Sequence, residues 1–448
     1  AARAAIISIP IIRPLVQIWA NLNEQIILLD EADIWIAPGV TLDRTAATPT
    51  IIDNVSGTYT DPVDCKIYGY GKIKNSYINI SNPNDRFECI KTINPNTKLE
   101  VRCDSISGTG GLTSSQIIAP SIYIVNGKKF HLKCNTVINN KTCGIALGFR
   151  PNAVQYHIDD VNLRVQKIEI DSDVVTNSES IAISTLATGF INVDEIICRH
   201  YGHCLLHAQG KIIATIRKMS VINNINFGGG IVRVDHGGSS ASQTLTLYFD
   251  EILALQTGII PSGTGFAIAQ AKAMLIGRRI YSKNNYAVQM NGGTTTISGS
   301  IKCNEIISET NVTFEIGEKV NQVLIDSNII EGFSSSESGL VFSKGSAKYV
   351  IRNARMRNYN TASGSRGISL FLFDSVYPNV SLWNVKIILD NSSANYVVYA
   401  NGTPSTDVSV YNYGLFGNKN YDTNNIDLKI GYEGSAGGYL FIEDINLA

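Results

Sequence analysis

The sequence predicts an all-β solenoid, a single-stranded parallel β-helix, on three observations. An apolar pattern returns at intervals of 23 to 33 residues, a period typical of solenoids, propellers or arrays. Each repeat holds about three short strand-like segments and no helical periodicity. Only 17% of the chain is charged, against about 25% in ordinary globular proteins, while 44% is apolar. Stacked coils with a shared apolar interior account for all three observations.

Each repeat is defined by an apolar anchor, which occurs thirteen times. Five residues before the anchor stands an aliphatic residue in twelve copies, and Tyr68 in the first. Apolar character is kept while residue identity changes, so each copy is expected to fill one slice of a shared core. The anchors are Ile73, Ile106, Val137, Ile168, Ile196, Met219, Ile252, Ile280, Ile306, Ile329, Met356, Ile387 and Leu415.

The residue types found two positions after the aliphatic residue predict a corner, where the strand bends. Early copies carry mostly apolar residues there, whereas the last four carry Asp326, Asn353, Asn384 and Asn412. Only three residues separate this position from the anchor, so the strand has to bend if both face the same side. Asn tolerates the left-handed backbone of a sharp bend, and stacked amides can hydrogen-bond along the stack.

The predicted organisation is one long body. Residues 31 to 420 form the β-helix of about 13 or more coils, residues 1 to 30 an attachment or capping segment, and residues 421 to 448 C-terminal strands or a cap. The N-terminal segment contains no uninterrupted apolar stretch of the ~20 residues that a spanning helix needs, so we expect no membrane insertion. With a net charge of −1 and both signs dispersed, we expect no nucleic-acid partner.

The eight cysteines have neither the paired spacing of a metal site nor the density of a disulfide scaffold. Cys103 and Cys134 occupy the same repeat position in successive copies, which would allow a disulfide between stacked strands. We expect reduced thiols that pack as small hydrophobic groups and a reducing place of assembly.

Four features carry a resemblance to a known family: the opening IWIAPGVTLD (34 to 43), the coil KIYGYGKIKN (66 to 75), the strand starts at Gly230 and Gly367, and the predicted Asn column. The chain resembles right-handed parallel β-helices of the pectin-lyase-like superfamily over about residues 31 to 420. With its N-terminal segment and short C-terminal cap it also looks like a bacteriophage tail-spike, tail-fibre or head-fibre protein.

That resemblance implies a structural and adhesive virion protein, assembled in the host cytoplasm and acting outside the cell. It implies a homotrimer that binds host-surface polysaccharide and contacts other virion proteins through residues 1 to 30, with no cofactor. Two alternatives stay open: a polysaccharide depolymerase, either a glycoside hydrolase or a lyase, on the same fold, and a cellular surface adhesin.

A polar ladder is the candidate ligand site. Alternate residues of the glycine-bounded strands are expected to point outwards, and a long face of amides, Arg and carboxylates suits a polymer of hydroxyls. An ordinary solvated sheet face explains the same pattern. The ladder residues are His207, Arg233, Asp235, Gln289, Asn291 and Glu315.

The catalytic candidates are carboxylates. Asp235 and Glu315 are expected about three coils apart, about 14 Å at ~4.8 Å per coil, whereas a glycosidase needs its pair at about 5 to 9.5 Å. Asp159 and Asp160 match part of the pectinase signature of the family that the chain resembles, but its other motifs are missing. Because Asp favours turns, we interpret these two residues as a turn pair.

The stretch CRHYGHCLLH (198 to 207) offers the ligand types that zinc or iron accepts. In an extended strand His203 and His207 would lie ~13 Å apart, so packing at a coil corner is the simpler interpretation. The candidate ligands are Cys198, His200, His203 and His207.

Overall fold

The structure is a computed structural model of the chain. It describes residues 13–53, 62–77, 87–109, 111–113, 116–118, 120–139, 143–148, 158–172, 179–183, 187–202, 204–208, 210–227, 231–234, 244–255, 272–283, 286–290, 297–317, 320–333, 339–344, 347–360, 366–371, 379–390, 396–401, 408–416, 430–433 and 440–444.

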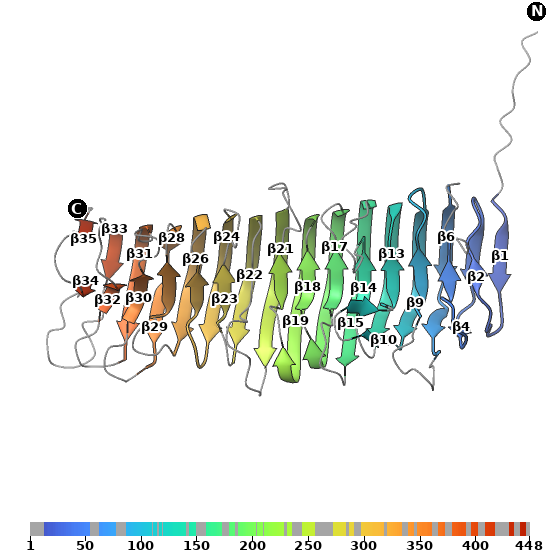
Figure 1. The fold of residues 1–448 in the computed structure, drawn as a ribbon, viewed down its shortest axis with the longest axis horizontal. Helices are drawn as coiled ribbons and strands as arrows, with labels where there is room; N and C mark the ends of the chain where they lie inside the picture. The colour runs from blue at the N-terminus through green and yellow to red at the C-terminus, as the bar shows by residue number, and fades with distance from the viewer. Residues whose placement is uncertain are drawn as a thin grey trace, which may run out of the picture.

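The described residues form strands and connections, with no helix among them. Figure 1 shows the strands side by side in chain order along an elongated body, from the blue N-terminal end to the red C-terminal end. All their pairings are parallel except that of the hairpin β10 (Gly111–Thr113) and β11 (Gln116–Ile118). The predicted all-β, parallel architecture is therefore confirmed.

One long sheet contains nineteen strands. They are β1 (Leu15–Ile18), β3 (Asp33–Ile36), β4 (Thr41–Arg44), β6 (Asp64–Gly69), β7 (Lys72–Asn75), β9 (Lys98–Gly108), β13 (Gly127–Asn139), β15 (Ile158–Ser172), β17 (Ala187–Gly202), β19 (Lys211–Phe227), β21 (Thr244–Leu255), β22 (Lys272–Ser282), β24 (Ile297–Ser308), β26 (Val320–Gly332), β28 (Lys348–Arg352), β29 (Arg355–Asn358), β31 (Asn379–Leu389), β33 (Val408–Phe416) and β35 (Leu440–Asp444).

Two further sheets contain eight and six strands. The eight-stranded sheet is made of β2 (Ile26–Ile27), β5 (Ile51–Ile52), β8 (Ile90–Thr92), β12 (Ile122–Ile124), β14 (Cys143–Leu147), β16 (Glu179–Ile183), β18 (Cys204–Ala208) and β20 (Val232–Val234). The six-stranded sheet is made of β23 (Val288–Met290), β25 (Phe314–Ile316), β27 (Val341–Lys344), β30 (Arg366–Phe371), β32 (Tyr396–Asn401) and β34 (Ile430–Glu433).

The chain alternates between the long sheet and one of the smaller ones, and we call each such passage a coil. β1 already pairs with β3, and β2 with β5, so the stack includes residues 15–27. At the other end β34 pairs with β32, and β35 with β33.

The register confirms most of the predicted anchor column. Ile73 pairs with Ile106, and the pairing continues without a slip through each predicted anchor to Ile306. Met356 and Ile387 pair as expected further along. These side chains belong to one cluster of buried residues that extends from Ile18 to Leu389.

Two anchors were placed wrongly. Ile306 pairs with Ile330, which is fully buried, and not with Ile329. The sequence could not separate these two because adjacent isoleucines satisfy the pattern equally. Leu415 pairs with Val385 and not with Ile387, since the last coil is shifted by two residues against the predicted alignment.

The predicted corner is confirmed for two of its four polar residues. Asn353 and Asn384 have left-handed φ angles of 58° and 51°, and their amides join across adjacent coils at 3.3 Å. Asp326 precedes the column by one residue, because Ser327 occupies its place opposite Cys303. Asn412 lies outside the column, since it pairs with Leu382.

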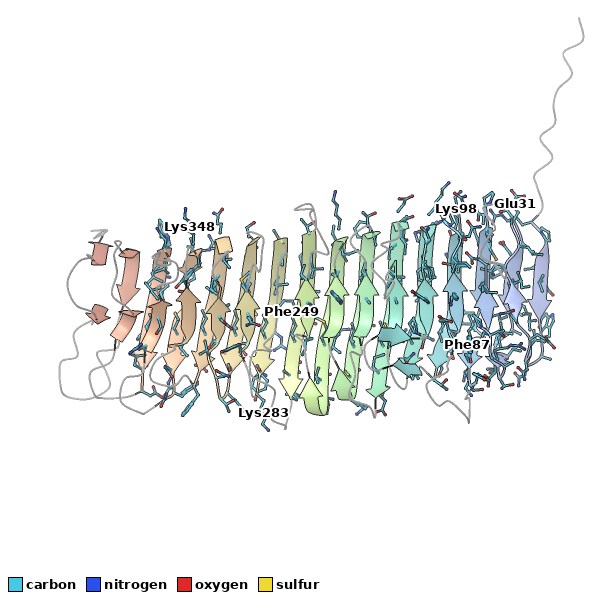
Figure 2. All side chains as sticks on the ribbon, in the orientation of Figure 1. Glu31, Phe87, Lys98, Phe249, Lys283 and Lys348 are labelled. Carbon is cyan, nitrogen blue, oxygen red and sulfur yellow. The ribbon has the colours of Figure 1, made fainter. Side chains whose placement is uncertain are left out.

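A large and a small residue face each other at one step of the column that contains Cys103 and Cys134. Phe249 lies inside the body (Figure 2) and pairs with Gly277 on the next coil. A Cβ on Gly277 would lie 2.4 Å from the Phe249 ring. The glycine therefore provides the space that the phenylalanine fills.

The seven cysteines whose side chains the structure describes are all buried, and none of them is in a disulfide. The neighbouring Cys134 thiol and burial together raise the pKa of Cys103. Burial raises the pKa of Cys198 to about 12. Both effects favour the neutral thiol, as expected for cysteines that act as core residues.

Candidate functional site

The predicted polar ladder is only partly assembled. Gln289 and Glu315 lie opposite each other on β23 and β25, and the Gln289 amide donates a 2.6 Å hydrogen bond to the Glu315 carboxylate. His207 pairs with Arg233 on β18 and β20. Asp235 and Asn291 lie outside the described residues, so their distance from Glu315 stays a prediction.

His207 does not face solvent as predicted. Its side chain is only 5% exposed, and Ala182, in the same outward column, is fully buried. The sequence pattern correctly placed His207 on the side of the strand away from the main core, but this part of the eight-stranded sheet is covered. An open ligand-binding face cannot include a covered histidine.

Asp159 and Asp160 lie in strand β15, not in a turn. The register slips between Ile158 and Val161 where β15 pairs with β17, so two aspartates oppose a single residue. This is the geometry of a β-bulge. Asp160 lies 2.9 Å from His131. Asp159 and Asp160 are both exposed, as is usual for a bulge at the surface.

Of the four metal candidates, the structure describes the side chains of only two, Cys198 and His207. Cys198 lies in the main core, whereas His207 lies on a different strand, β18. The side chains of His200 and His203 lie outside the described part of the chain. No group of three potential metal ligands occurs among the described side chains.

A groove that the sequence reasoning missed crosses the outer face of the long sheet at its N-terminal end. It spans β3, β6, β9 and β13 and has a volume of about 540 Å³, within the usual ~300 to 1,000 Å³ of ligand sites. We call it the groove. Its lining residues are Asp33, Trp35, Lys66, Ile67, Tyr68, Gly69, Tyr70, Glu100, Arg102, Cys103, Lys133, Cys134 and Asn135.

Strand alternation brings the aromatic side chains of the groove to the outer face. In β3, Ile34 and Ile36 are buried and Trp35 points away from the core between them. Trp35 pairs with Tyr68 on β6, and its ring contacts that of Trp19 edge-on, with centroids 4.6 Å apart. Two neighbouring coils therefore present adjacent aromatic rings.

Tyr70 is presented by a tight bend between two glycines. Gly69 has a φ of 126°, and a Cβ there would lie 2.0 Å from the backbone oxygen of Ile36. A Cβ on Gly71 would lie equally close to the Ile36 side chain. Only glycine fits such approaches, and the Tyr70 side chain between them is 73% exposed.

This bend also explains a wrong sequence alignment. Ile67, not Tyr68, pairs with Val101 in the aliphatic column, because this coil has one residue more than the next between that column and the anchor. Tyr68 consequently faces the groove and not the core. The Gly-Tyr-Gly triplet was the available signal for the extra residue.

The two carboxylates of the groove are already paired. Glu100 accepts a hydrogen bond from Lys129 and lies 4.0 Å from Lys66. Lys129 holds the pKa of Glu100 below its usual value. Asp33 lies 3.5 Å from Arg13. Both carboxylates are therefore engaged in structural ion pairs.

Three cations form a column on the same face and have no such partners. Arg102 pairs in register with Lys133, and Lys133 with Arg164, so their side chains stand on adjacent strands ~4.8 Å apart at the backbone. All three are exposed. Within the part of the chain that the structure describes, none of the three side chains has an acidic partner or a hydrogen bond. Directly opposed like charges destabilise a sheet. An anion bound across the column would reduce this repulsion.

The described part of the chain has no helix with the length and hydropathy of a membrane span. Comparison with protein-family models, with curated proteins and with solved structures found no match to the chain. The functional assignment therefore depends on the groove and its column of cations.

Proposed function

We propose that this protein is a structural and adhesive rod that binds a host cell-surface glycan in the groove. In this proposal the stacked coils form a right-handed parallel β-helix of the pectin-lyase-like kind, and the protein is a bacteriophage fibre or tail spike. The single observation that carries the binding function is the cluster of Trp35, Tyr68 and Tyr70 beside polar and charged groups, with Tyr70 exposed and the other two partly exposed.

Aromatic side chains on a flat polar surface suit sugars for a physical reason. One face of a pyranose ring consists of C–H groups, which pack favourably on the electron-rich face of an aromatic ring. The hydroxyl groups at the sugar edge need hydrogen-bond partners, and Lys66 and Asn135 line the same groove. Large exposed aromatic patches are also a usual sign of an interaction site.

The stiffness of the stack fits the proposed adhesive role. One buried cluster links the coils from Ile18 to Leu389, so the groove at one end is held by a continuous core. The strands of the long sheet lie on sixteen successive levels from β1 to β35, which at ~4.8 Å per step correspond to about 70 Å of rod. A rod of this kind can hold a binding face away from a particle surface.

Self-association as a homotrimer belongs to the same proposal, as does attachment to other virion proteins through residues 1 to 30. What favours self-association is an apolar stripe on the long sheet. Phe190 pairs with Ile213, and Met274 lies two coils further in the same column. These three side chains are 57%, 45% and 45% exposed. Light scattering of the wild type and of a Phe190→Ser/Met274→Ser variant tests this part: the proposal expects a trimer that dissociates in the variant.

The binding function is tested with immobilised bacterial surface polysaccharides. Wild-type protein is expected to bind at least one of them saturably, and Trp35→Ala/Tyr70→Ala is expected to lose that binding. Trp383→Ala is the matched control, because Trp383 is also exposed on the long sheet but lies far from the groove. Equal binding by the groove variant would contradict the proposal. Reducing or unsaturated ends released during the assay would identify the depolymerase alternative.

A further inference from the structure

The column of cations narrows the ligand class. We propose that Arg102, Lys133 and Arg164 bind the acidic groups of a linear anionic polysaccharide that lies along the rod, with a sugar ring on Trp35 or Tyr68. This inference rests on the proposed glycan-binding function and adds to it the charge of the ligand and the direction of its chain. The ligand class is a polymer of sugars with carboxylate or sulfate groups.

Several other cations on this sheet are matched by carboxylates on neighbouring strands. Arg199 bonds Glu169 at 2.9 Å, and Arg352 bonds Asp326 at 2.8 Å. Arg217 stands between Asp194 and Asp250. In the column, three successive coils carry a cation and the structure gives none of them a carboxylate. Their mutual repulsion is relieved when an external anion binds.

The geometry sets the direction of the bound chain. Trp35 pairs with Tyr68, and Arg102, Lys133 and Arg164 continue the same outward column over the next three coils. The column is thus aromatic at one end and cationic at the other, and it runs across the strands along the axis of the rod. A linear chain in this position places neutral ring faces on the aromatic end and acidic groups at the cationic end.

The chemistry of the cations fits both acidic groups. Arg binds carboxylate or sulfate through two parallel N–H donors, whereas Lys acts as a mobile point charge. Because all three side chains are exposed, their attraction for an anion is screened by salt. The inference therefore predicts affinity that falls with ionic strength, in contrast to binding by aromatic stacking alone.

Alginate oligosaccharides, which carry a carboxylate on each sugar, provide the first probe. The same oligosaccharides with every carboxylate reduced to an alcohol provide the uncharged match, and dextran sulfate provides a second anionic polymer. Binding is followed by tryptophan fluorescence in a Trp383→Phe background. The chain has three tryptophans, so the signal then comes from Trp35 in the groove and from Trp19, whose ring contacts it.

The expected result is binding of at least one anionic polymer, little binding of the reduced alginate, and weaker binding as salt rises from about 0.1 M to about 1 M, where the screening length falls from ~10 Å to ~3 Å. Arg102→Gln/Lys133→Gln/Arg164→Gln is expected to bind about tenfold more weakly. This triple variant should be folded and at least as heat-stable as the wild type, because a like-charge column is removed.

Arg355→Gln/Lys386→Gln is the matched control. These residues are also exposed and paired on adjacent strands of the long sheet, but they lie far from the groove. The inference is overturned if this control weakens binding as much as the triple variant, if the triple variant binds like the wild type, or if neither anionic polymer binds. A further outcome is that alginate and its reduced form bind equally and in a way that depends on Trp35. That result would overturn the proposal that the ligand is anionic, but it would leave the proposed glycan binding intact.

Discussion

The side-chain amide of Asn384 donates a hydrogen bond to the side-chain oxygen of Asn353 on the preceding coil, and both residues have a left-handed backbone. The Asn353 amide in turn donates a 3.1 Å hydrogen bond to Asp326. One residue type thus serves two purposes at the corner: it tolerates the bend and it connects successive coils.

Two substitutions at Asn384 separate these purposes. Asn384→Ala is expected to lower the free energy of unfolding by about 1–2 kcal/mol for the left-handed backbone, and by about 0.5–1.5 kcal/mol more for the lost hydrogen bond. Asn384→Gly removes only the amide contribution, since glycine adopts this backbone freely. Denaturant midpoints followed by Trp383 fluorescence provide the comparison. Equal losses in the two variants would show that the bend is not strained.

The contact between Phe249 and Gly277 predicts that substitutions at the two positions have non-additive effects on the free energy of unfolding. Gly277→Ala is expected to cost about 1–3 kcal/mol, because the new methyl group overlaps the Phe249 ring. Phe249→Val alone leaves a cavity and costs a similar amount. The double variant should lose less than the two single variants together, by about 0.5–3 kcal/mol. Additive losses in the unfolding cycle would mean that the two residues do not share one space.

Thiol chemistry tests the burial of the cysteines. In native protein the seven buried thiols should not react with Ellman's reagent, because they are inaccessible. Burial also raises the pKa of Cys303 to about 12. All should react after unfolding in denaturant. A mass lower by two hydrogens in the non-reduced protein would contradict the free Cys103 and Cys134 thiols.

The ion pair between Glu100 and Lys129 is expected to make the stability of the protein depend on pH. The Lys129 contact lowers its pKa in the folded protein, so its contribution is present above the unfolded value of 4.5 and is lost as the pH falls through the lower, folded value. Wild type should therefore melt at a higher temperature than Glu100→Gln near pH 7, by an amount typical of a partly exposed pair. The difference should shrink below pH 4.5. A difference that is constant down to pH 2 would show that the charge is not its source.

Much of the fold could be predicted because burial has the same period in every coil. The column from Ile73 to Ile306 was found from apolar character alone. The errors at Ile329, Tyr68 and Leu415 are all errors of register. They come from an adjacent isoleucine, an extra residue in the bend and a two-residue shift of the coil, respectively, and only the strand pairing settles such a register.

The binding site could not be predicted in the same way. The sequence pattern places His207 on the outward side of its own strand, but it does not show which outward faces are covered. The groove also depends on the extra residue in the bend at Gly69 to Gly71. Arg102, Lys133 and Arg164 become a column only once the register of three strands is known.

The most direct test of the account is the position of a bound polysaccharide in a structure of the complex. The account predicts sugar density along the outer face of the long sheet, on Trp35 and Tyr68 and continuing over Arg102 towards Arg164. Density on the smaller sheets around Gln289 and Glu315, with an empty groove, would contradict it.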